Sequence, residues 1–545
     1  MKPRTLALAL VIVLPMSACA RAQSQPATTQ AVRPNVLEKG PYLQALTPTS
    51  VQIRWEGRDG THGRVEWGAA PDRLDRAAVA SIYPLTASYP EFLVTKGRDP
   101  RLPPPPIITV NVALQRVELT DLKPETTYHY RVRQGGVVTE TYEFRTPPVN
   151  PRTFRLIIYG DTRTDTAGHR SVVQALRQVA PRPAFVVNTG DLVTLGDRWP
   201  LWSEEFFGPL HPFAAEVPIS ILRGNHEQGG QFLRPLFDLP GPEGTNYYRL
   251  DYGPARFIAL DCYASVPRQA AWLEEQLRAT PRPTWTFILL HEPPFSATTS
   301  RSYGRGYERE RLMLLAQRYG VDFIFTGHDH VYARTVPILF DRTMRGEPTT
   351  QVITGSGGAP QHSLGHPTYL AAGARTRHFC VIDIDGPKFK MTVVNDAGKT
   401  IDEFRLEKGA KGKIIDPADY RERAQQVSDI NAIESLRRSL TAFALKAVHV
   451  GDVVELASAV DNPYHGPVKV TVKFVGYATR WVLPPPVEMT IPDGAVAAPF
   501  KMTLTAKKDL ADYSDGGRLE VEYVLPDGRK GALRGEGIRI AAEGE

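Results

Sequence analysis

A chain of 545 residues is too long to fold around one hydrophobic core, and its length suits three or four domains of ordinary size. With 42% apolar and 23% charged residues, the composition is that of an ordinary globular protein and excludes wholesale disorder. The formal net charge of +6 is spread without a dense block of Lys or Arg, so there is no nucleic-acid-binding signal and only a weak preference for anionic ligands.

The first 19 residues, MKPRTLALALVIVLPMSAC, have two basic residues, an apolar stretch and then small residues that end at Cys19. The apolar stretch is too short to cross a bilayer, so it predicts a secretory signal. Small residues before a cysteine resemble a bacterial lipoprotein signal, with Cys19 as the lipidated N-terminus and residues 20–35 as a polar linker. We expect an exported periplasmic or cell-envelope lipoprotein whose membrane attachment is the lipid on Cys19; plain secretion is the alternative.

Residues 36–147 contain short strands with alternating apolar and polar positions, among them SVQIRWE, GRVEWG and TYHYRVRQ. This pattern predicts a β-sandwich. Together with the turn and Tyr-rich strand in LTDLKPETTYHYRV, it resembles a fibronectin type III-like domain, in particular the N-terminal domain of purple acid phosphatases. The PPPP run at 103–106 favours an extended loop.

Residues 151–408 alternate apolar strand-like runs with helix-like segments such as SVVQALRQV, PRQAAWLEEQLRA and ERERLMLLAQRY. The alternation predicts an α/β layered domain. A charged helical linker at 409–440 and a small strand-rich β-sandwich of unknown role at 441–545 follow. Cys262 and Cys380 lie in strand-like runs and are expected to be buried free thiols, with a disulfide as the alternative.

Five apolar runs of the central region each deliver Asp, Asn or His where the strand ends. They end in GD at 160–161, GD at 190–191, GNHE at 224–227, HEP at 291–293 and GHDH at 327–330. Ligands of open α/β sheets bind outside the carboxyl ends of the strands, and four of these five motifs begin with a glycine that allows a tight turn. The series therefore predicts a metal site.

The order GD, GD, GNHE, H and GHDH resembles the calcineurin-like metallophosphoesterase superfamily, and with the preceding sandwich it is most similar to its purple acid phosphatase branch. The resemblance covers residues 36–408 and implies two divalent ions, Fe, Mn or Zn. It implies that Asp191 bridges the ions, that Asp161 and His330 hold the first, and that Asn225, His291 and His328 hold the second. It places His226 beside the phosphate as a catalytic residue, and we expect Glu227 to orient this neighbour.

Two positions depart from the family pattern. The superfamily usually has a histidine where this chain has Arg163, and purple acid phosphatases instead have a tyrosine where this chain has Thr194. Without a tyrosinate we expect no iron charge-transfer colour. Water could complete the first ion's ligands, Arg163 could bind the phosphate of the substrate, or the first ion could bind weakly or be absent. We favour the first two together.

The fold class expected from these patterns is multi-domain: an N-terminal β-sandwich, a central α/β domain with α/β/β/α layers and a C-terminal β-sandwich. The expected function is metal-dependent hydrolysis of a small anionic phosphate mono- or diester, with nucleotidase or cyclic-phosphodiesterase specificity left open. A non-catalytic surface binding protein is the alternative. Asp165 and His169 could be recruited as ligands, although Asp165 more simply caps a helix, and the basic segment 303–311 could form a substrate rim. His211, His362 and His449 are expected to be ordinary surface or turn histidines.

Overall fold

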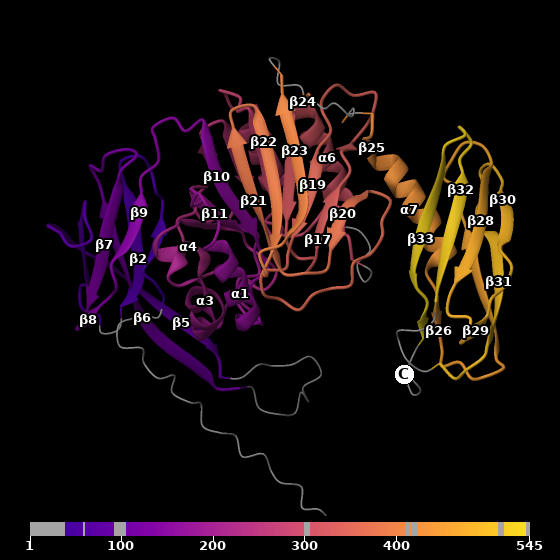
Figure 1. Cartoon of the computed structure of the whole chain (residues 1–545), viewed down its shortest axis with the longest axis horizontal. Helices are drawn as coiled ribbons and strands as arrows, with labels where there is room; N and C mark the ends of the chain where they lie inside the picture. Colours follow the sequence, from indigo (N-terminus) through magenta and orange to yellow (C-terminus); the bar gives the residue numbers. More distant parts are fainter. Residues whose placement is uncertain are drawn as a thin grey trace, which may run out of the picture.

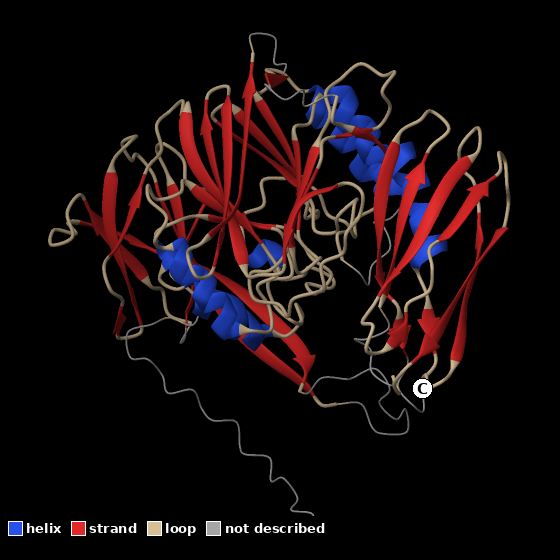
Figure 2. Cartoon of the chain, turned by 45° about the vertical axis from the view of Figure 1, so that its right-hand side comes forward, coloured by secondary structure: helices blue, strands red, loops and turns tan. Residues whose placement is uncertain are grey.

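The computed structural model describes residues 37, 39–57, 60–91, 105–298, 306–409, 414–415, 420, 422–510 and 517–540 (Figures 1 and 2). The expected signal, Cys19 and the linker 20–35 lie outside these ranges, as do the first residues of the expected rim at 303–311. Within them, no helix is both long and apolar enough to span a membrane.

The N-terminal part is a sandwich of two β-sheets, seen at one end of the molecule in Figure 1. Alternation produces it: in TYHYRVRQ every second side chain, from Tyr128 to Gln134, is buried between the sheets. One sheet has the order β1 (Tyr42–Gln44), β2 (Val51–Gly57), β6 (Ile107–Leu119), β5 (Ser81–Pro90). The other has the order β4 (Arg76–Val79), β3 (Arg64–Gly68), β7 (Thr127–Gln134), β8 (Val137–Val138), with β9 (Tyr142–Arg145) also paired to β7.

The central domain contains two seven-stranded sheets. The first has the order β12 (Ile219–Ile221), β11 (Phe185–Asn188), β10 (Thr153–Tyr159), β21 (His378–Asp385), β22 (Lys388–Asn395), β23 (Thr400–Lys408), β24 (Ile414–Ile415). The second has the order β13 (Tyr248–Tyr252), β14 (Ala255–Ala259), β15 (Trp285–Leu289), β16 (Phe323–Thr326), β19 (Thr350–Thr354), β17 (Tyr332–Thr335), β20 (Leu370–Ala374). Neighbours among β10 to β12, and among β14, β15, β16 and β19, are parallel, so within each group the carboxyl ends lie at one edge.

The layering follows from alternate residues in the buried strands. In the second sheet, Phe287 and Phe323 face the first sheet, where both rings contact Phe389. Their neighbours Ile288 and Ile324 face the opposite way and pack with side chains of α5 (Val266–Arg278) and α6 (Gly306–Tyr319). On the outer face of the first sheet, Val172, Val173 and Leu176 of α1 (Thr166–Leu176) join its core. The α/β/β/α fold class is confirmed. α5 and α6 coincide with two of the expected segments to within two residues, whereas α1 begins five residues before the segment SVVQALRQV and ends three residues before the end of that segment.

Shorter elements complete this domain. Between β11 and β12 the chain forms α2 (Trp199–Leu201), a π-helical turn η1 (Trp202–Phe207), α3 (Gly208–Leu210) and a 3-10 turn η2 (Phe213–Ala215). Further along lie α4 (Leu233–Leu236), β18 (Ile338–Leu339) and β25 (Gln425–Gln426), and the last two pair with each other.

Within the stretch 409–440, expected as a helical linker, the described helix is α7 (Val427–Thr441), and β24 and β25 are short strands paired into the central domain. Glu434 of α7 accepts hydrogen bonds from the backbone N–H and hydroxyl of Thr368, which ties α7 to the central domain.

The C-terminal part is a second sandwich, built on the other side of α7 (Figure 1). Its two sheets share one core around Trp481 and Phe500, to which Leu436 and Leu440 of α7 also contribute. One sheet has the order β27 (Val453–Val460), β31 (Ala498–Ala506), β29 (Trp481–Val482); the other has β30 (Val487–Ile491), β28 (Val468–Val475), β32 (Arg518–Val524), β33 (Lys530–Gly537); and β26 (Ala444–Leu445) pairs with β34 (Arg539–Ile540).

Buried hydrogen bonds fix the N-terminal sandwich to the central domain. The hydroxyl of Tyr42 donates to the carbonyl of Leu236 at 2.6 Å, and the hydroxyl of Tyr130 donates to the carbonyl of Ala215 at 2.7 Å. His211, expected to be an ordinary turn histidine, lies at the same interface, with its Nε2 2.8 Å from the Tyr142 hydroxyl.

Candidate metal centre

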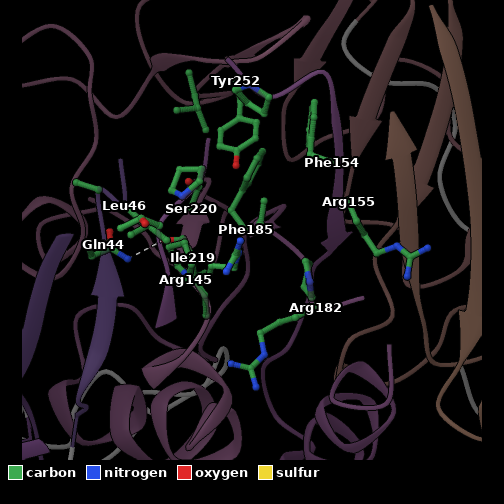
Figure 3. A pocket seen from close by; sticks show the side chains of 18 of the residues that line it. Gln44, Leu46, Arg145, Phe154, Arg155, Arg182, Phe185, Ile219, Ser220 and Tyr252 are labelled. Carbon is green, nitrogen blue, oxygen red and sulfur yellow. Dashed lines mark hydrogen bonds between the residues drawn. The ribbon is translucent and has the colours of Figure 1, made fainter. Parts of the chain in front are cut away.

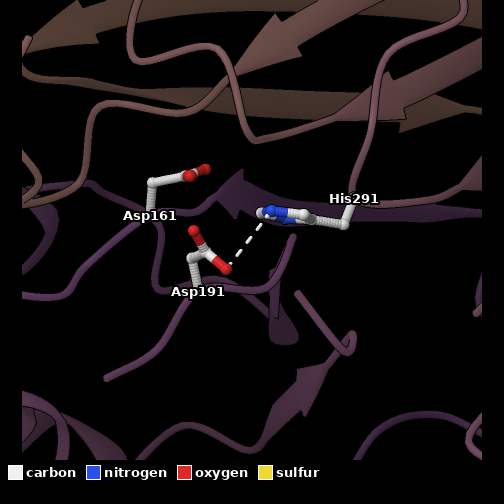
Figure 4. Close-up of side chains that lie close together, drawn as sticks. All are labelled: Asp161, Asp191 and His291. Atoms are coloured by element: carbon white, nitrogen blue, oxygen red, sulfur yellow. Dashed lines mark ion pairs between the residues drawn. The ribbon is translucent and has the colours of Figure 1, made fainter. Parts of the chain in front are cut away.

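The predicted site residues gather at the carboxyl edge of both sheets. Asp161 follows β10, Asp191 follows β11 and His291 follows β15, and all three are buried. One ligand atom from each lies within 4.8 Å of the others, and Figure 4 shows the two carboxylates and the imidazole facing one another. Loops after β12 and β16 add Asn225, His226, His328 and His330, and the loop after β10 also carries Arg163.

Three of the predicted ligands adopt a backbone conformation that side chains disfavour. Asp161 and Asp191 have a φ of 55° and His328 has a φ of 66°. Non-glycine residues in this left-handed region cost on the order of 1–3 kcal/mol each and are concentrated at functional sites. Three such residues in one cluster indicate that the loops are shaped for a function at some cost in stability.

The glycines of the motifs are needed for close approach more than for their own turns. A Cβ on Gly224 would lie 2.2 Å from Asp191 Oδ1, and a Cβ on Gly327 would lie 2.4 Å from Asp161 Oδ2. Only Gly190 among the four has a positive φ, at 98°. In these turns the positive φ is therefore mostly at the residue that follows the glycine. The glycines of the GNHE and GHDH loops instead allow those loops to approach the carboxylates of Asp191 and Asp161.

The predicted second metal position has four donor atoms at the spacing that a metal requires. His291 Nε2 lies 3.2 Å from Asn225 Oδ1, 3.2 Å from His328 Nδ1 and 3.3 Å from Asp191 Oδ1, and His328 Nδ1 lies 3.0 Å from Asn225 Oδ1. Ligands about 2.1 Å from an ion at tetrahedral angles lie about 3.4 Å from one another. These residues fit a divalent ion.

The protonation of His291 supports the same conclusion. Its Nδ1 lies 2.9 Å from the carbonyl of Thr189, so this nitrogen carries the hydrogen. The lone pair of Nε2 then points toward the other ligand atoms of the predicted second metal position. Burial lowers the pKa of this imidazole, but the carboxylates of Asp191 and Asp161 outweigh burial and raise it. A positive charge is therefore stabilised at this point, either a proton or a metal ion.

The predicted first metal position is different, because Arg163 reaches into it. His330 donates from Nδ1 to the carbonyl of Pro360 at 2.6 Å, which leaves its Nε2 lone pair 3.3 Å from Asp161 Oδ1. The Nη2 of Arg163 lies 3.4 Å from His330 Nε2, and its Nε lies 3.3 Å from Asp191 Oδ2. The donors fit a metal ion, and a guanidinium already contacts two of them.

Asp191 is the centre of the charge balance. Burial would raise the pKa of its carboxyl, but His291, His226 and Arg163 outweigh burial and hold the pKa below its ordinary value. Asp191 is thus ionised, with Oδ1 facing His291 and Oδ2 facing Arg163, and its bridging role stays a prediction.

We expected Glu227 to orient the His226 side chain, but it positions the loop of Asp191 instead. Its Oε2 accepts from the backbone N–H of Asp191 at 2.8 Å and of Gly224 at 2.7 Å, and its Oε1 accepts from that of Leu192 at 2.7 Å. Burial, followed by the charge of Asp191, raises the pKa of Glu227. This carboxylate joins the GD loop to the GNHE loop.

His226 lies beside the predicted metal ligands but does not itself supply a ligand atom to either metal position. Its Nδ1 donates to the carbonyl of Thr194 at 2.6 Å, and its Nε2 lies 3.9 Å from Asp191 Oδ2. Its side chain is 26% exposed. The ring therefore turns Nε2 toward the metal site from the solvent side, where a substrate oxygen would arrive.

The two residues that could have been recruited as ligands have structural roles. Asp165 caps α1 by accepting from the N–H of Gly168 at 2.9 Å, and it pairs with Arg377. His169 is fully buried, with Nδ1 2.9 Å from the carbonyl of Glu205 and Nε2 3.2 Å from the Tyr159 hydroxyl. Burial lowers the pKa of His169 to about 4, so it is neutral at neutral pH.

Sequence reasoning missed the role of the Gly-rich loop that supports His330. His362, expected to be an ordinary histidine, stacks on His330 with ring centroids 3.9 Å apart, and its Nδ1 accepts from the His330 backbone N–H at 3.0 Å. The glycines of the preceding GSGG sequence allow contact with the site, since a Cβ on Gly355 would lie 2.4 Å from the carbonyl of Asp329. The signal was present, because this Gly-rich loop directly follows β19, a parallel neighbour of β16.

A separate pocket of about 420 Å³ lies between the N-terminal sandwich and the central domain (Figure 3). It is lined by Phe154 and Phe185, at the starts of β10 and β11, so it lies at the opposite edge of the sheet from the predicted ligands. Two of its three arginines, Arg155 and Arg182, are paired with carboxylates, including those of Asp383 and Glu216 in the lining. The pocket is not part of the metal centre.

Comparison with known proteins agrees with this geometry. The family model for calcineurin-like phosphoesterases matches residues 154–332, and that for the N-terminal domain of purple acid phosphatases matches residues 41–146. The chain therefore contains a calcineurin-like phosphoesterase domain that follows a domain of the purple acid phosphatase N-terminal type.

Its relatives include purple acid phosphatase 21 of Arabidopsis thaliana, 27% identical over 296 residues, which are 50% of this chain and 61% of the relative. Probable inactive purple acid phosphatase 27 of the same plant is 26% identical over 302 residues, covering 45% and 49%. The structure of purple acid phosphatase PPD1 from yellow lupin seeds aligns with a TM-score of 0.55 at 20% identity, over 68% of this chain and 74% of that chain. The chain thus spans less than two thirds of the length of these two curated relatives.

Proposed function

We propose that this protein is a phosphoesterase that hydrolyses small anionic phosphate mono- or diesters with two divalent ions, Fe, Mn or Zn. The observation that carries the proposal is the meeting of Asp191, Asn225, His291 and His328 at metal-ligand spacing, with Nε2 of His226 beside them. A structural metal site would not need His226. The family match supports the same reaction, and the relatives named as phosphatases make phosphate esters the substrate class to test first.

The chain's residues divide the work. Asp161 and His330 would hold one ion, Asn225, His291 and His328 the other, and Asp191 both. Divalent ions, when bound, supply positive charge to the phosphoryl oxygens and make a water molecule a stronger nucleophile. His226 contacts the phosphate and, when protonated at Nε2, gives its proton to the leaving oxygen. Arg163, when turned toward the substrate, donates two hydrogen bonds to phosphate oxygens.

The test uses chelator-treated protein and p-nitrophenyl phosphate or bis(p-nitrophenyl) phosphate. Adding Mn²⁺, Zn²⁺ or Fe²⁺ should raise the hydrolysis of at least one ester by about 100-fold or more above the metal-free protein, because charge stabilisation at such sites is worth several kcal/mol. Metal solution without protein is the control. Protein that rebinds metal and hydrolyses neither ester would contradict the proposal.

That negative result would favour the second candidate, a non-catalytic surface binding protein. Arg163 at the first metal position is the observation in its favour, and one relative is named as probably inactive.

We also propose that the protein is exported and anchored by lipid at Cys19. The support is the basic, apolar and small-residue order of the first 19 residues. A labelled fatty acid fed to expressing bacteria should enter the wild-type protein and not Cys19→Ala. Equal labelling, or none in either, would contradict the anchor.

A further inference from the structure

Arg163 contacts two of the side chains that are predicted to hold the first ion. Its Nε is 3.3 Å from Asp191 Oδ2 and its Nη2 is 3.4 Å from His330 Nε2, while its side chain is only 15% exposed. His330 Nε2 and the Asp161 carboxylate, 3.3 Å apart, are both electron-pair donors and need a positive charge near them. In this structure the guanidinium supplies that charge.

A chain of hydrogen bonds holds Arg163 in this place. Its Nη1 donates to Thr164 Oγ1 at 3.1 Å, and Thr164 Oγ1 lies 3.0 Å from Thr194 Oγ1. Thr194 in turn donates from its hydroxyl to Glu205 Oε1 at 2.9 Å and from its backbone N–H to Glu205 Oε2 at 2.6 Å. Arg163 and Thr194, the two departures from the family pattern, are therefore parts of one hydrogen-bonded unit.

The backbone of this unit is also strained to serve it. Thr164 has a φ of 73°, a value at which a β-branched residue is an outlier. The strain places the Thr164 hydroxyl between Arg163 and Thr194. A loop that only connected β10 to α1 would have no need of this conformation.

We propose that Arg163 is an internal cation that occupies the first metal position until an ion displaces it, so that the two positions fill with unequal affinity. The inference rests on the proposed function for the assignment of the two positions. An ion bound to Asp191 Oδ2 and His330 Nε2 would lie within a few Å of the guanidinium that contacts the same two atoms. Two positive charges that close repel each other strongly, so the ion and the guanidinium compete for these atoms. Filling the first position requires Arg163 to leave, and its new place on the solvent side is the one from which it can reach the substrate's phosphate.

The test is metal binding, which does not depend on any substrate. Chelator-treated full-length protein is titrated with Mn²⁺ or Zn²⁺ by calorimetry, and the bound metal is counted by elemental mass spectrometry. The wild type should bind one ion tightly and a second on the order of 10- to 100-fold more weakly, the usual range of coupling between two sites. Arg163→Met, similar in length and uncharged, should strengthen the binding of the second ion and so reduce the difference in affinity between the two ions.

Arg155→Met is the matched control, since Arg155 pairs with Asp383 at the far edge of the same sheet, and its titration should equal the wild type. Thr164→Ala removes the hydroxyl that holds the guanidinium. It should reduce the difference in affinity between the two ions, but by less than Arg163→Met does. If Arg163→Met fails to fold, as judged by circular dichroism, Thr164→Ala decides.

Two wild-type ions of equal affinity would overturn the inference, as would an Arg163→Met titration that matches the wild type. The proposed function can fail separately: a shifted second step in a protein that hydrolyses no phosphate ester keeps the inference and rejects the enzyme.

Discussion

Replacing Asp191 with asparagine should lower phosphate-ester hydrolysis and metal affinity at least about 100-fold each. Changes to residues that merely support metal ligands cost 10- to 100-fold, and Asp191 contacts the donors of both positions. Asparagine has the same shape and keeps the oxygen that accepts from the His226 backbone N–H at 3.0 Å, so the fold should survive. What it loses is the negative charge that His291, His226 and Arg163 stabilise in the folded protein.

The measurement is a metal titration with a parallel rate assay. Asp385→Asn is the matched control, because this exposed carboxylate, bonded to the Thr153 hydroxyl, lies at the far end of the same sheet. It should leave both quantities unchanged. Full metal content in Asp191→Asn would show that the ions bind elsewhere.

His226→Ala should lower kcat by about 10²- to 10⁴-fold, the usual contribution of a general acid or base, and leave metal content unchanged. The reason is its geometry: Nδ1 is committed to the carbonyl of Thr194, and Nε2 faces the site without completing the donor set at either position. In this variant the rate should therefore fall while the bound metal stays constant, whereas in Asp191→Asn both should fall.

His449→Ala serves as the control, since His449 is a mostly exposed histidine of the C-terminal sandwich. An unchanged rate in His226→Ala would remove His226 from the reaction. Loss of metal together with rate would instead make it a ligand.

The sequence predicts the position of this site because polar residues at the ends of parallel strands must meet at one edge. Asp161, Asp191 and His291 are separated by up to 130 residues in the chain, yet their places after three strands were enough to bring them together. The layers were predictable for a similar reason, since alternation and helical spacing fix which face of each element is buried.

Contacts between loops were not predictable. The target of Glu227 depends on how the GNHE loop folds over the GD loop, and the spacing of residues along the chain says nothing about that. His362 is a lone histidine in the sequence and becomes part of the site only because the GSGG loop packs against Asp329 and His330. The link from Arg163 to Thr194 through Thr164 likewise needs three-dimensional geometry.

Central to this account is that the strand-end cluster, and not the pocket of Figure 3, holds metal and phosphate. The most direct measurement is anomalous X-ray diffraction at the metal absorption edge, from crystals of the Mn²⁺- or Zn²⁺-loaded protein grown with phosphate. We predict a peak bounded by Asn225, His291 and His328, with phosphate within reach of His226. Metal or phosphate found only in the pocket lined by Phe154 and Phe185, or no peak at the cluster of a protein that binds metal, would contradict it.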